Sequence, residues 1–459
     1  MRSRLGGSLV CTALLAAVIG SVGAPLITAV ATGMGVSLDA AQWTLTIPLF
    51  TGAIAGPLLG RLGSGPYRRV TILITLAVVV FGGLLTVLPL PFWVLLVGRG
   101  LQGFGVAGGA LLMSVARAHL PPERAASTIG ALSVASTVGI GVGYPLISFV
   151  DQVAGLRAAY GLGFVLSAAA LGIAWRALPV EEPGELPRVD TVGAVLLALG
   201  TSGVLLVVAE PEVWASPWWV GCVLAGAAVV LAGWVAVELR VPAPLVDLRV
   251  LGQGPVLRAN AALLVAGVGL YLLFSLFTRF VQTPAGVDYG FALPGVAAGA
   301  ALIPFSVLGF VAGKSLPSLI ARVGERGAYA LSTAIAVAAA LLFAAANQSL
   351  VVVLAAIALL GFAVGGISAV MPRLVLAGVP QGETASVLSI NQISRSIGFS
   401  MGSALAGLLL AAGGAPLPPE HDYVLAALWA LPALAASALV VTANRTTATR
   451  DARPADRRQ

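Results

Sequence analysis

The chain has 459 residues, of which 59% are hydrophobic and 9% are charged, and its mean hydropathy is +1.01. A soluble globular domain carries roughly a quarter charged residues, so this composition excludes a water-soluble body and predicts an all-α membrane protein. The formal net charge of +7 does not indicate a nucleic-acid partner, because the basic residues are dispersed through short loops.

Apolar windows of about twenty residues can cross a bilayer as helices, and the chain contains fourteen such windows. Eight are predicted near 8–32, 42–60, 70–90, 92–116, 127–150, 158–175, 191–209 and 217–237. Six more are predicted near 259–281, 291–313, 327–346, 350–372, 385–412 and 423–442, with turn chemistry at Asn347-Gln348-Ser349 separating two of them. The windows 191–209 and 217–237 carry the weakest signal and are alternatively a peripheral pair.

The distribution of basic residues predicts the orientation of these spans. With both termini in the cytoplasm, 21 of the 25 Lys and Arg residues fall on the cytoplasmic side. Only Arg157 and Arg279 then lie outside, while Arg99 and Arg395 lie within spans. Because short cytoplasmic loops carry an excess of Lys and Arg, this bias predicts an even number of spans and cytoplasmic termini.

An internal repeat divides the chain. The segment that begins Pro121-Pro122-Glu123-Arg124-Ala125-Ala126-Ser127 matches Pro380-Gln381-Gly382-Glu383-Thr384-Ala385-Ser386, and Gly139 and Gly143 then match Gly398 and Gly402 at the same offset of 259. The repeat predicts two parallel six-helix bundles, as in transporters that rock around a central site. The predicted units are a bundle at 1–176, linkers with two inserted helices at 177–258, a second bundle at 259–444 and a disordered basic cytoplasmic tail at 445–459.

Arg99 lies inside the fourth span, in the sequence Gly98-Arg99-Gly100-Leu101-Gln102-Gly103-Phe104-Gly105. A buried arginine costs about 2.5–3.5 kcal/mol even on insertion scales, so we expect it to face a polar cavity or a partner. Gln102 shares its helix face, and Gly103 and Gly105 allow another helix to approach closely.

Here the chain resembles the major facilitator superfamily, in its fourteen-span drug:proton antiporter branch, over essentially its whole length. Arg99, Gln102, Gly103 and Gly105 are similar to the motif of the fourth helix, whose arginine is tied to proton coupling in that family. The stretch Gly56-Pro57-Leu58-Leu59-Gly60-Arg61-Leu62-Gly63 with Arg68 resembles the loop motif after helix two, which helps to control the conformational switch. The resemblance implies a major facilitator fold with two additional inserted helices.

Two features depart from the family pattern. Gly60 stands where the loop motif normally has an acidic residue. The antiporter motif of helix five is recognisable in Gly139, Gly143 and Pro145, but its closing glycines are missing; alternatively, this stretch is only a glycine-rich packing face. Pro145 removes one helical hydrogen bond and can kink the helix.

Proton coupling requires a group that titrates, and arginine does not. No acidic residue lies near the middle of any predicted span, and Ile19 occupies the position where many relatives have an aspartate. Asp151, at the outer end of the fifth span, is the first candidate for the proton carrier. It is alternatively an ordinary solvated loop residue.

Polar side chains on several spans predict a substrate cavity between the two bundles. Arg395 shares a helix with Asn391 and Gln392, and Thr46 and Asn260 lie at comparable depth on other spans. Two buried arginines without a central carboxylate predict a substrate that is neutral, hydrophobic or anionic, and disfavour a permanently cationic drug. Both Arg99 and Arg395 are expected to line this cavity.

The sequence therefore predicts a transporter that exports small hydrophobic compounds, such as drugs or secondary metabolites, by alternating access and proton antiport. The alternatives are an uptake transporter or uniporter of a small neutral or anionic solute, and a non-transporting sensor with the same fold. An enzyme is not expected, since clustered His, Asp or Glu residues at membrane depth are lacking. We expect a monomer in the inner (plasma) membrane, whose partners are a small-molecule substrate, protons and the lipid bilayer, with no metal, cofactor or nucleic acid.

Overall fold

A computed structural model describes residues 2–63, 65–181, 190–209, 216–242, 244–246, 248–283, 288–293, 295–411 and 418–443. These residues form helices and turns and contain no strand. Segment 445–459, for which the sequence predicts a disordered tail, lies outside them. Residues 182–189, within the predicted linker region, lie outside them as well.

The N-terminal helices (α1–α7) begin with a bent pair, α1 (Arg2–Ser21) and α2 (Gly23–Met34), which meet at an angle of 43°. They continue with α3 (Leu38–Leu62), α4 (Arg68–Val87), α5 (Phe92–His119), α6 (Pro122–Ala154) and α7 (Leu156–Ala177). Two helices follow, α8 (Thr191–Ala209) and α9 (Pro217–Glu238), and a short α10 (Leu248–Leu251) precedes the second group.

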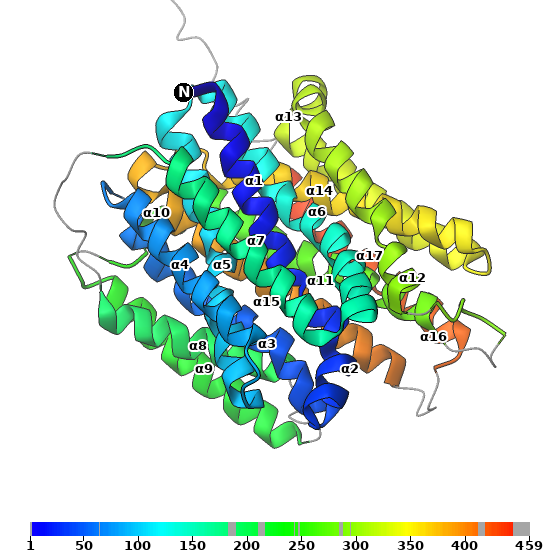
Figure 1. The fold of residues 1–459 in the computed structure, drawn as a ribbon. Coiled ribbons are helices and arrows are strands. Elements are labelled where there is room, and N and C mark those ends of the chain that lie inside the picture. Colours follow the sequence, from blue (N-terminus) through cyan, green and yellow to red (C-terminus); the bar gives the residue numbers. More distant parts are fainter. Residues whose placement is uncertain are drawn as a thin grey trace, which may run out of the picture.

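The C-terminal helices (α11–α17) are α11 (Gly254–Gln282), α12 (Gly295–Ala300), α13 (Ile303–Ala346), α14 (Leu350–Val375), α15 (Thr384–Ala411), α16 (Glu420–Leu428) and α17 (Ala430–Thr442), with a 3-10 turn at Gln381–Glu383. The sequence predicts a loop between spans near 313 and 327, but this segment is helical. The reversal of the chain nevertheless falls inside the predicted range, at Gly324, whose φ of +73° is a left-handed conformation that glycine adopts without steric cost (Figure 1). The predicted turn at Asn347-Gln348-Ser349 is present between α13 and α14.

Ten helical segments in the described ranges are long and apolar enough to cross a membrane, and eleven if the bent pair α1–α2 forms one span. That number treats Gly295–Ala346 as one segment, although Gly324 divides it, and it includes neither α6 nor α8. Fourteen spans therefore remains a prediction.

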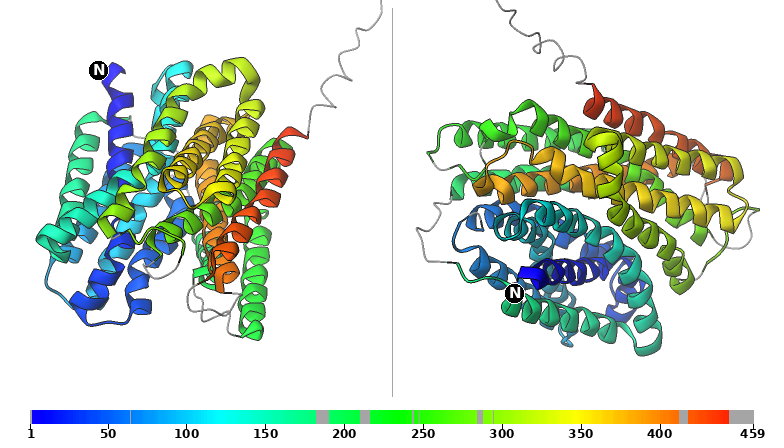
Figure 2. Two further views of the ribbon diagram at one scale, coloured as in Figure 1. Left: turned by 90° about the vertical axis from the view of Figure 1, so that its right-hand side faces the viewer. Right: turned by 90° about the horizontal axis from the view of Figure 1, so that it is seen from above.

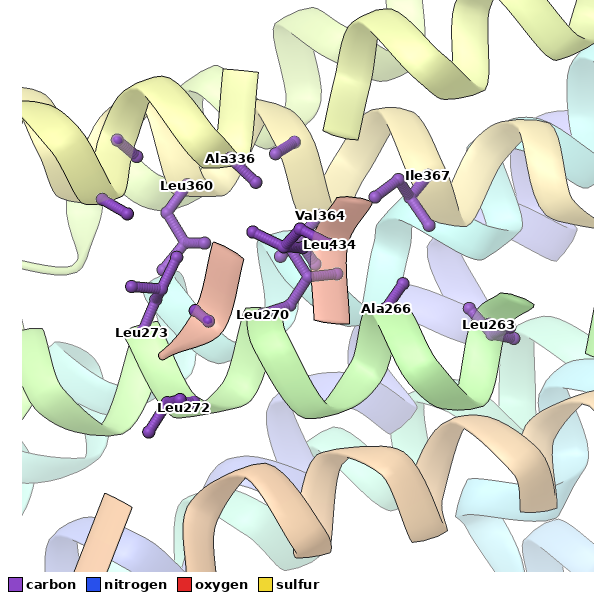
Figure 3. Packing of buried hydrophobic residues seen from close by; sticks show 14 of the residues in the cluster. Leu263, Ala266, Leu270, Leu272, Leu273, Ala336, Leu360, Val364, Ile367 and Leu434 are labelled. Carbon is purple, nitrogen blue, oxygen red and sulfur yellow. The ribbon is translucent and has the colours of Figure 1, made fainter. Parts of the chain in front are cut away.

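Each group of helices has its own apolar packing. In the C-terminal group, Leu263, Ala266, Leu270 and Leu273 of α11 face side chains of α13, α14 and α17, including Ala336, Leu360, Val364, Ile367 and Leu434 (Figure 3). A separate cluster joins α1, α3, α4, α5, α6 and α7, and viewed from above the two groups lie side by side (Figure 2). Close packing inside each group leaves the boundary between them as the place for a cavity.

Helices α8 and α9 pack on each other at the edge of the molecule, where α8 touches α3 and α15 (Figure 1). Most of α9 is exposed, and Trp218 and Trp219 are 77% and 65% accessible. The pair therefore lies outside the two groups of helices, and α9 is among the helices long and apolar enough to cross a membrane.

The chain starts α1 and ends α17 at the same end of the molecule (Figure 2). We call this end the terminal side. The helices α3 and α5 end there, and α15 begins there, so the segments that carry the loop motif and the repeat lie close together.

Candidate functional site

A cavity of about 1150 Å³ lies between the two groups of helices. Its lining comes from α1 to α6 on one side and from α11, α13, α14 and α15 on the other. Small-molecule sites typically occupy about 300–1,000 Å³, so this cavity has room for a large organic compound. Thr46, Asn391, Gln392 and Arg395, all predicted cavity residues, line it.

Arg395 lies on the cavity side of α15 in a setting of rings and amides. Its Nη2 donates a hydrogen bond of 2.6 Å to Gln392 Oε1, one turn earlier on the same helix. Its Cζ lies 5.8 Å from the ring centroid of Phe399, which stacks on Tyr271 of α11 at 4.3 Å. An aromatic face attracts a guanidinium through the quadrupole of the ring, so the stacked rings of Phe399 and Tyr271 help to hold the Arg395 guanidinium beside the cavity.

Asn260 stands behind the lining. The Nδ2 of Asn391 donates to Asn260 Oδ1 at 3.0 Å, and Asn260 Nδ2 donates to the carbonyl of Val256 at 3.0 Å. This pair ties α15 to α11 at membrane depth. Asn260 thus orients a cavity residue and does not itself line the cavity.

The expectation that Arg99 lines the cavity is wrong. Its side chain is fully buried among the N-terminal helices, where Nε donates to the Thr44 carbonyl at 2.8 Å and Nη1 donates to Gln102 Oε1 at 2.6 Å. A Cβ added at Gly23, beside the bend between α1 and α2, would lie 2.8 Å from Nη2. The guanidinium therefore joins α3 and α5 beneath the bend in the first span.

Asp151 and Tyr160 lie on the far side of the same network. Tyr160, on α7, interacts electrostatically with both Arg99 and Asp151. Tyr160 is almost fully buried, whereas Asp151, near the end of α6, is partly exposed. Asp151, the predicted proton carrier, and Arg99 are thus both within electrostatic range of Tyr160. None of these three residues lines the cavity.

The glycines of the two motifs mark where helices touch. A Cβ at Gly103 would overlap Thr51 and the Pro48 carbonyl of α3, whereas Gly105 has more room and lines the cavity. Gly139 and Gly143 bring α6 onto α1 at Ala17, Val18 and Ser21, and Pro145 contacts Gly299 of α12.

The repeat has the same packing role in the second half. Gly398 and Gly402 bring α15 onto α11, as Gly139 and Gly143 bring α6 onto α1. The backbones agree as well, because Pro121 and Pro380 precede these helices with φ and ψ of −55° and 148° and of −58° and 150°.

At the terminal side, the two groups are linked by polar contacts. Arg61 forms an ion pair with Glu383 at 3.5 Å. Arg117 donates to the Val379 carbonyl at 2.7 Å and to Thr384 Oγ1 at 2.8 Å. We call the contacts made by Arg61 and Arg117 the latch.

Two other loop-motif positions behave differently. Arg68 donates to Glu181, in the segment that follows α7, at 2.6 Å and to the Gly63 carbonyl at 3.1 Å. Gly60 faces α15, because a Cβ there would lie 2.8 Å from Ser389 Oγ and 3.1 Å from the Ala385 carbonyl. Where the family pattern has a carboxylate, this chain therefore has direct backbone contact between α3 and α15.

Several residues of the site were missed by sequence reasoning. Tyr271, Phe399 and Arg279 line the cavity, and Arg117 and Ser389 join the two groups. A signal for the first set exists, since the polar and aromatic residues of α11 recur every three or four positions from Tyr271 to Gln282. Arg117, in the last turn of α5, belongs to no comparable pattern.

Comparison with known proteins places this geometry in a family. The family model described as Major Facilitator Superfamily matches residues 9–403. A triacylglyceride transporter of Mycobacteroides abscessus is 30% identical over 258 residues, which cover 53% of this chain and 49% of that protein. Its counterpart in Mycolicibacterium smegmatis is 32% identical over 255 residues, covering 52% of this chain and 45% of that protein. The chain thus matches about half the length of these curated relatives.

Solved structures agree on the fold. The human organic anion transporter MFSD10 (TETRAN) superposes with a TM-score of 0.68 at 14% identity, covering 96% of this chain and 99% of that one. The POT family peptide transporter PepTSo gives a TM-score of 0.62 at 15% identity, covering 96% and 98%. A family of transporters, and relatives named as transporters, fit a protein that is not an enzyme. The match over most of its length shows that the chain belongs to the Major Facilitator Superfamily.

Proposed function

We propose that the protein is a secondary active transporter that exports hydrophobic compounds across the plasma membrane by alternating access. The observation that carries this proposal is the cavity of about 1150 Å³ between two groups of helices whose closing contacts lie at one end. A transporter with this arrangement loads its substrate between the groups and exposes it to the two sides in turn.

The proposed topology has fourteen spans, two six-helix bundles at 1–176 and 259–444, and both termini in the cytoplasm. The common position of the two ends of the helical chain supports an even number of spans (Figure 2). In this orientation the latch is cytoplasmic, and the cavity lining extends to Gln282, the last residue of α11, on the outer side. The conformation described above is then one closed toward the cytoplasm.

The proposed cargo is a hydrophobic compound of drug or lipid type. The cavity lining of α1, α4 and α5 is dominated by Gly, Ala, Leu, Ile, Val and Met. Relatives named triacylglyceride transporters favour a lipid-like compound over a small polar solute. The uptake and uniport alternatives share this cavity, so only a flux measurement separates them.

Proton antiport is the proposed source of energy. Asp151 is the proposed proton carrier, because both it and Arg99 act electrostatically on the buried Tyr160, which places all three in one region of the N-terminal helices. A proton on Asp151 removes one negative charge beside this network and so changes the electrostatic energy of the arginine and its helices.

The test is transport in inverted membrane vesicles that hold the full chain, with a fluorescent triacylglycerol analogue and a neutral hydrophobic dye as cargo. Accumulation inside the vesicles that collapses when the pH gradient is dissipated supports proton-coupled export. Flux that only follows the cargo gradient indicates a uniporter, and pH-driven flux in the opposite direction indicates uptake. Absence of flux together with absence of conformational exchange would favour the sensor.

A further inference from the structure

The cavity has two chemically different walls. The polar wall consists of the lining residues of α11 and α15, and the apolar wall consists of the lining residues of α1, α3, α4, α5 and α6. Both charged residues of the described lining, Arg279 and Arg395, belong to the polar wall, as do Gln282, Asn391 and Gln392. Among the lining residues that the structure describes, none is Asp or Glu.

The two helices of the polar wall present matching faces. On α11 the polar and aromatic lining positions are Tyr271, Phe274, Ser275, Thr278, Arg279 and Gln282, and on α15 they are Asn391, Gln392, Arg395, Ser396, Phe399, Ser400 and Ser403. The other lining residues of these two helices are Leu263, Leu270, Leu388, Ala404, Gly407 and Leu408. This spacing of three and four residues keeps every one of these side chains on a single side of its helix. The polar wall therefore carries hydroxyls, amides and two guanidinium groups, interspersed with the rings of Tyr271, Phe274 and Phe399.

The apolar wall offers little hydrogen bonding despite its few hydroxyl groups. Thr12, Ser21, Thr75 and Ser133 each donate to a carbonyl three or four residues earlier on their own helix, at 2.7–3.1 Å. Their protons are thus engaged within the helices. Thr46 and Tyr144 are the other hydroxyl-bearing lining residues of this wall, and most of the rest is Gly, Ala and aliphatic surface.

We propose that the substrate is an amphiphile with an acidic headgroup, a carboxylate, phosphate or sulfonate, whose acid group binds Arg395 and whose hydrocarbon part lies on the apolar wall. This inference rests on the transport function proposed above and names its substrate class. A guanidinium forms strong charge-assisted hydrogen bonds with such groups, and the attraction increases in a cavity of low dielectric. Contact between the hydrocarbon part and the apolar wall contributes to the binding free energy in proportion to the apolar area that it removes from water.

Arg279 extends this site along α11 toward the end of the cavity that lies away from the terminal side. It lies eight residues beyond Tyr271 on α11, which corresponds to about 12 Å along the helix axis. Tyr271 stacks on Phe399, whose ring faces the Arg395 guanidinium, so the two arginines mark an inner and an outer position for the same acid group. Arg395 is the binding position, and Arg279 receives the headgroup on its way out.

The experiment compares three amphiphiles of equal chain length, decanoate, decanol and decyltrimethylammonium, as ligands of the full chain in phosphatidylcholine nanodiscs. Binding is measured by the shift in thermal unfolding and by intrinsic tryptophan fluorescence, with empty nanodiscs as a blank. We expect decanoate to bind about tenfold or more tightly than the other two, as a charge-assisted contact predicts. Equal affinities, or a preference for the cation, would overturn the proposal without any variant.

Arg395→Gln is expected to lower the affinity for decanoate about tenfold and to leave that for decanol unchanged. Arg395→Lys retains the charge and keeps part of the preference for the anion. Arg258→Gln is the matched control, because Arg258 lies on α11 outside the cavity and donates to the Gly254 carbonyl. Undiminished anion preference in a folded Arg395→Gln protein would contradict the assignment.

The transport assay separates this inference from the proposed function. Anion-selective binding that depends on Arg395, without any flux, leaves the inference standing and removes the export function. The opposite result is a protein that binds decanoate no better than decanol and still exports neutral cargo, with export unchanged in Arg395→Gln. It would leave the export function standing and remove the inference about the acidic headgroup.

Discussion

At the scale of single residues, the two intramembrane arginines have separate tasks. Arg99 is fully buried and donates to Thr44 and Gln102, which makes it a connection between α3 and α5. Arg395 lies on the cavity wall beside Gln392 and Phe399. The cost of placing a guanidinium at membrane depth is offset by protein acceptors in the first case and by an amide, rings and the open cavity in the second.

Arg99→Ala is expected to lower the stability of the folded protein. The change leaves the Thr44 carbonyl and the Gln102 amide oxygen buried without their donor, at a cost of about 1–3 kcal/mol each. Thermal unfolding in nanodiscs measures the effect, with Arg124→Ala, at an exposed position, as the control. Equal unfolding temperatures for the two variants would contradict the connecting role.

Asp151→Asn is expected to uncouple flux from the pH gradient. The amide keeps the shape of the side chain but carries no titratable proton, so accumulation driven by the gradient falls to the level of protein-free vesicles. Asp288→Asn, at an exposed loop position, is the matched control. Full gradient-driven accumulation in Asp151→Asn vesicles would exclude this residue as the carrier.

At the scale of elements, small residues set which helix faces touch. Gly398 and Gly402 bring α15 onto α11, and Gly139 and Gly143 do the same for α6 and α1. Close approach of helices in a membrane relies on such residues, since burial of apolar surface from lipid gains little. The contacts of Gly398 and Gly402 fix how α15 lies against α11, and so align the lining residues of the two helices that form the polar wall.

Gly398→Ala is expected to destabilise the protein by about 1–3 kcal/mol through overpacking, because the new Cβ would overlap the Leu264 carbonyl of α11. Gly221→Ala is the control, since nothing lies within 4 Å of the position of its added Cβ on the exposed face of α9. The measurement is the midpoint of thermal unfolding. A midpoint that falls as little for Gly398→Ala as for Gly221→Ala would contradict the contact.

At the scale of the whole molecule, the latch joins the two groups of helices at the terminal side, and in the proposed cycle it holds that side closed. Arg61 and Arg117 reach from the N-terminal helices to the start of α15, and Ser389 donates to the Gly56 carbonyl at 2.9 Å. These contacts have to break when the terminal side opens. Their strength therefore biases the equilibrium between the two conformations.

Arg117→Ala is expected to shift this equilibrium toward opening at the terminal side by roughly tenfold or more, because each lost hydrogen bond from a charged donor is worth about 1.5–3 kcal/mol. Spin labels at Gly65→Cys and Gln381→Cys, in a chain with Cys11 and Cys222 replaced by alanine, report the distance between the two groups. A longer distance should gain population in the variant. An unchanged distribution would show that the Arg117 contacts do not hold this side closed.

The proposed topology predicts labelling from opposite sides of the membrane. Pro121→Cys and Gln381→Cys should react with an impermeant maleimide only from the cytoplasmic side, and Asp288→Cys only from the outside. Both groups of positions are exposed in the structure. Labelling of Gln381→Cys from outside in intact cells would invert the orientation and with it the direction of the proposed transport.

Sequence alone established that the chain is a helical membrane protein and where its main helices lie, because backbone groups in lipid are satisfied only within long apolar helices. The motif around Arg99 and the repeated glycines also identified the family and the places where helices meet. Which residues face the cavity was decided only by the tertiary structure: Arg395 and Arg279 line it, and Arg99 does not. Arg117 joins the two groups of helices, a role that no sequence motif indicates. The reason is physical, since both the lipid-facing and the protein-facing sides of a membrane helix are apolar. The rotation of each helix is therefore set by close contacts such as Gly103 on Pro48 rather than by hydrophobic periodicity.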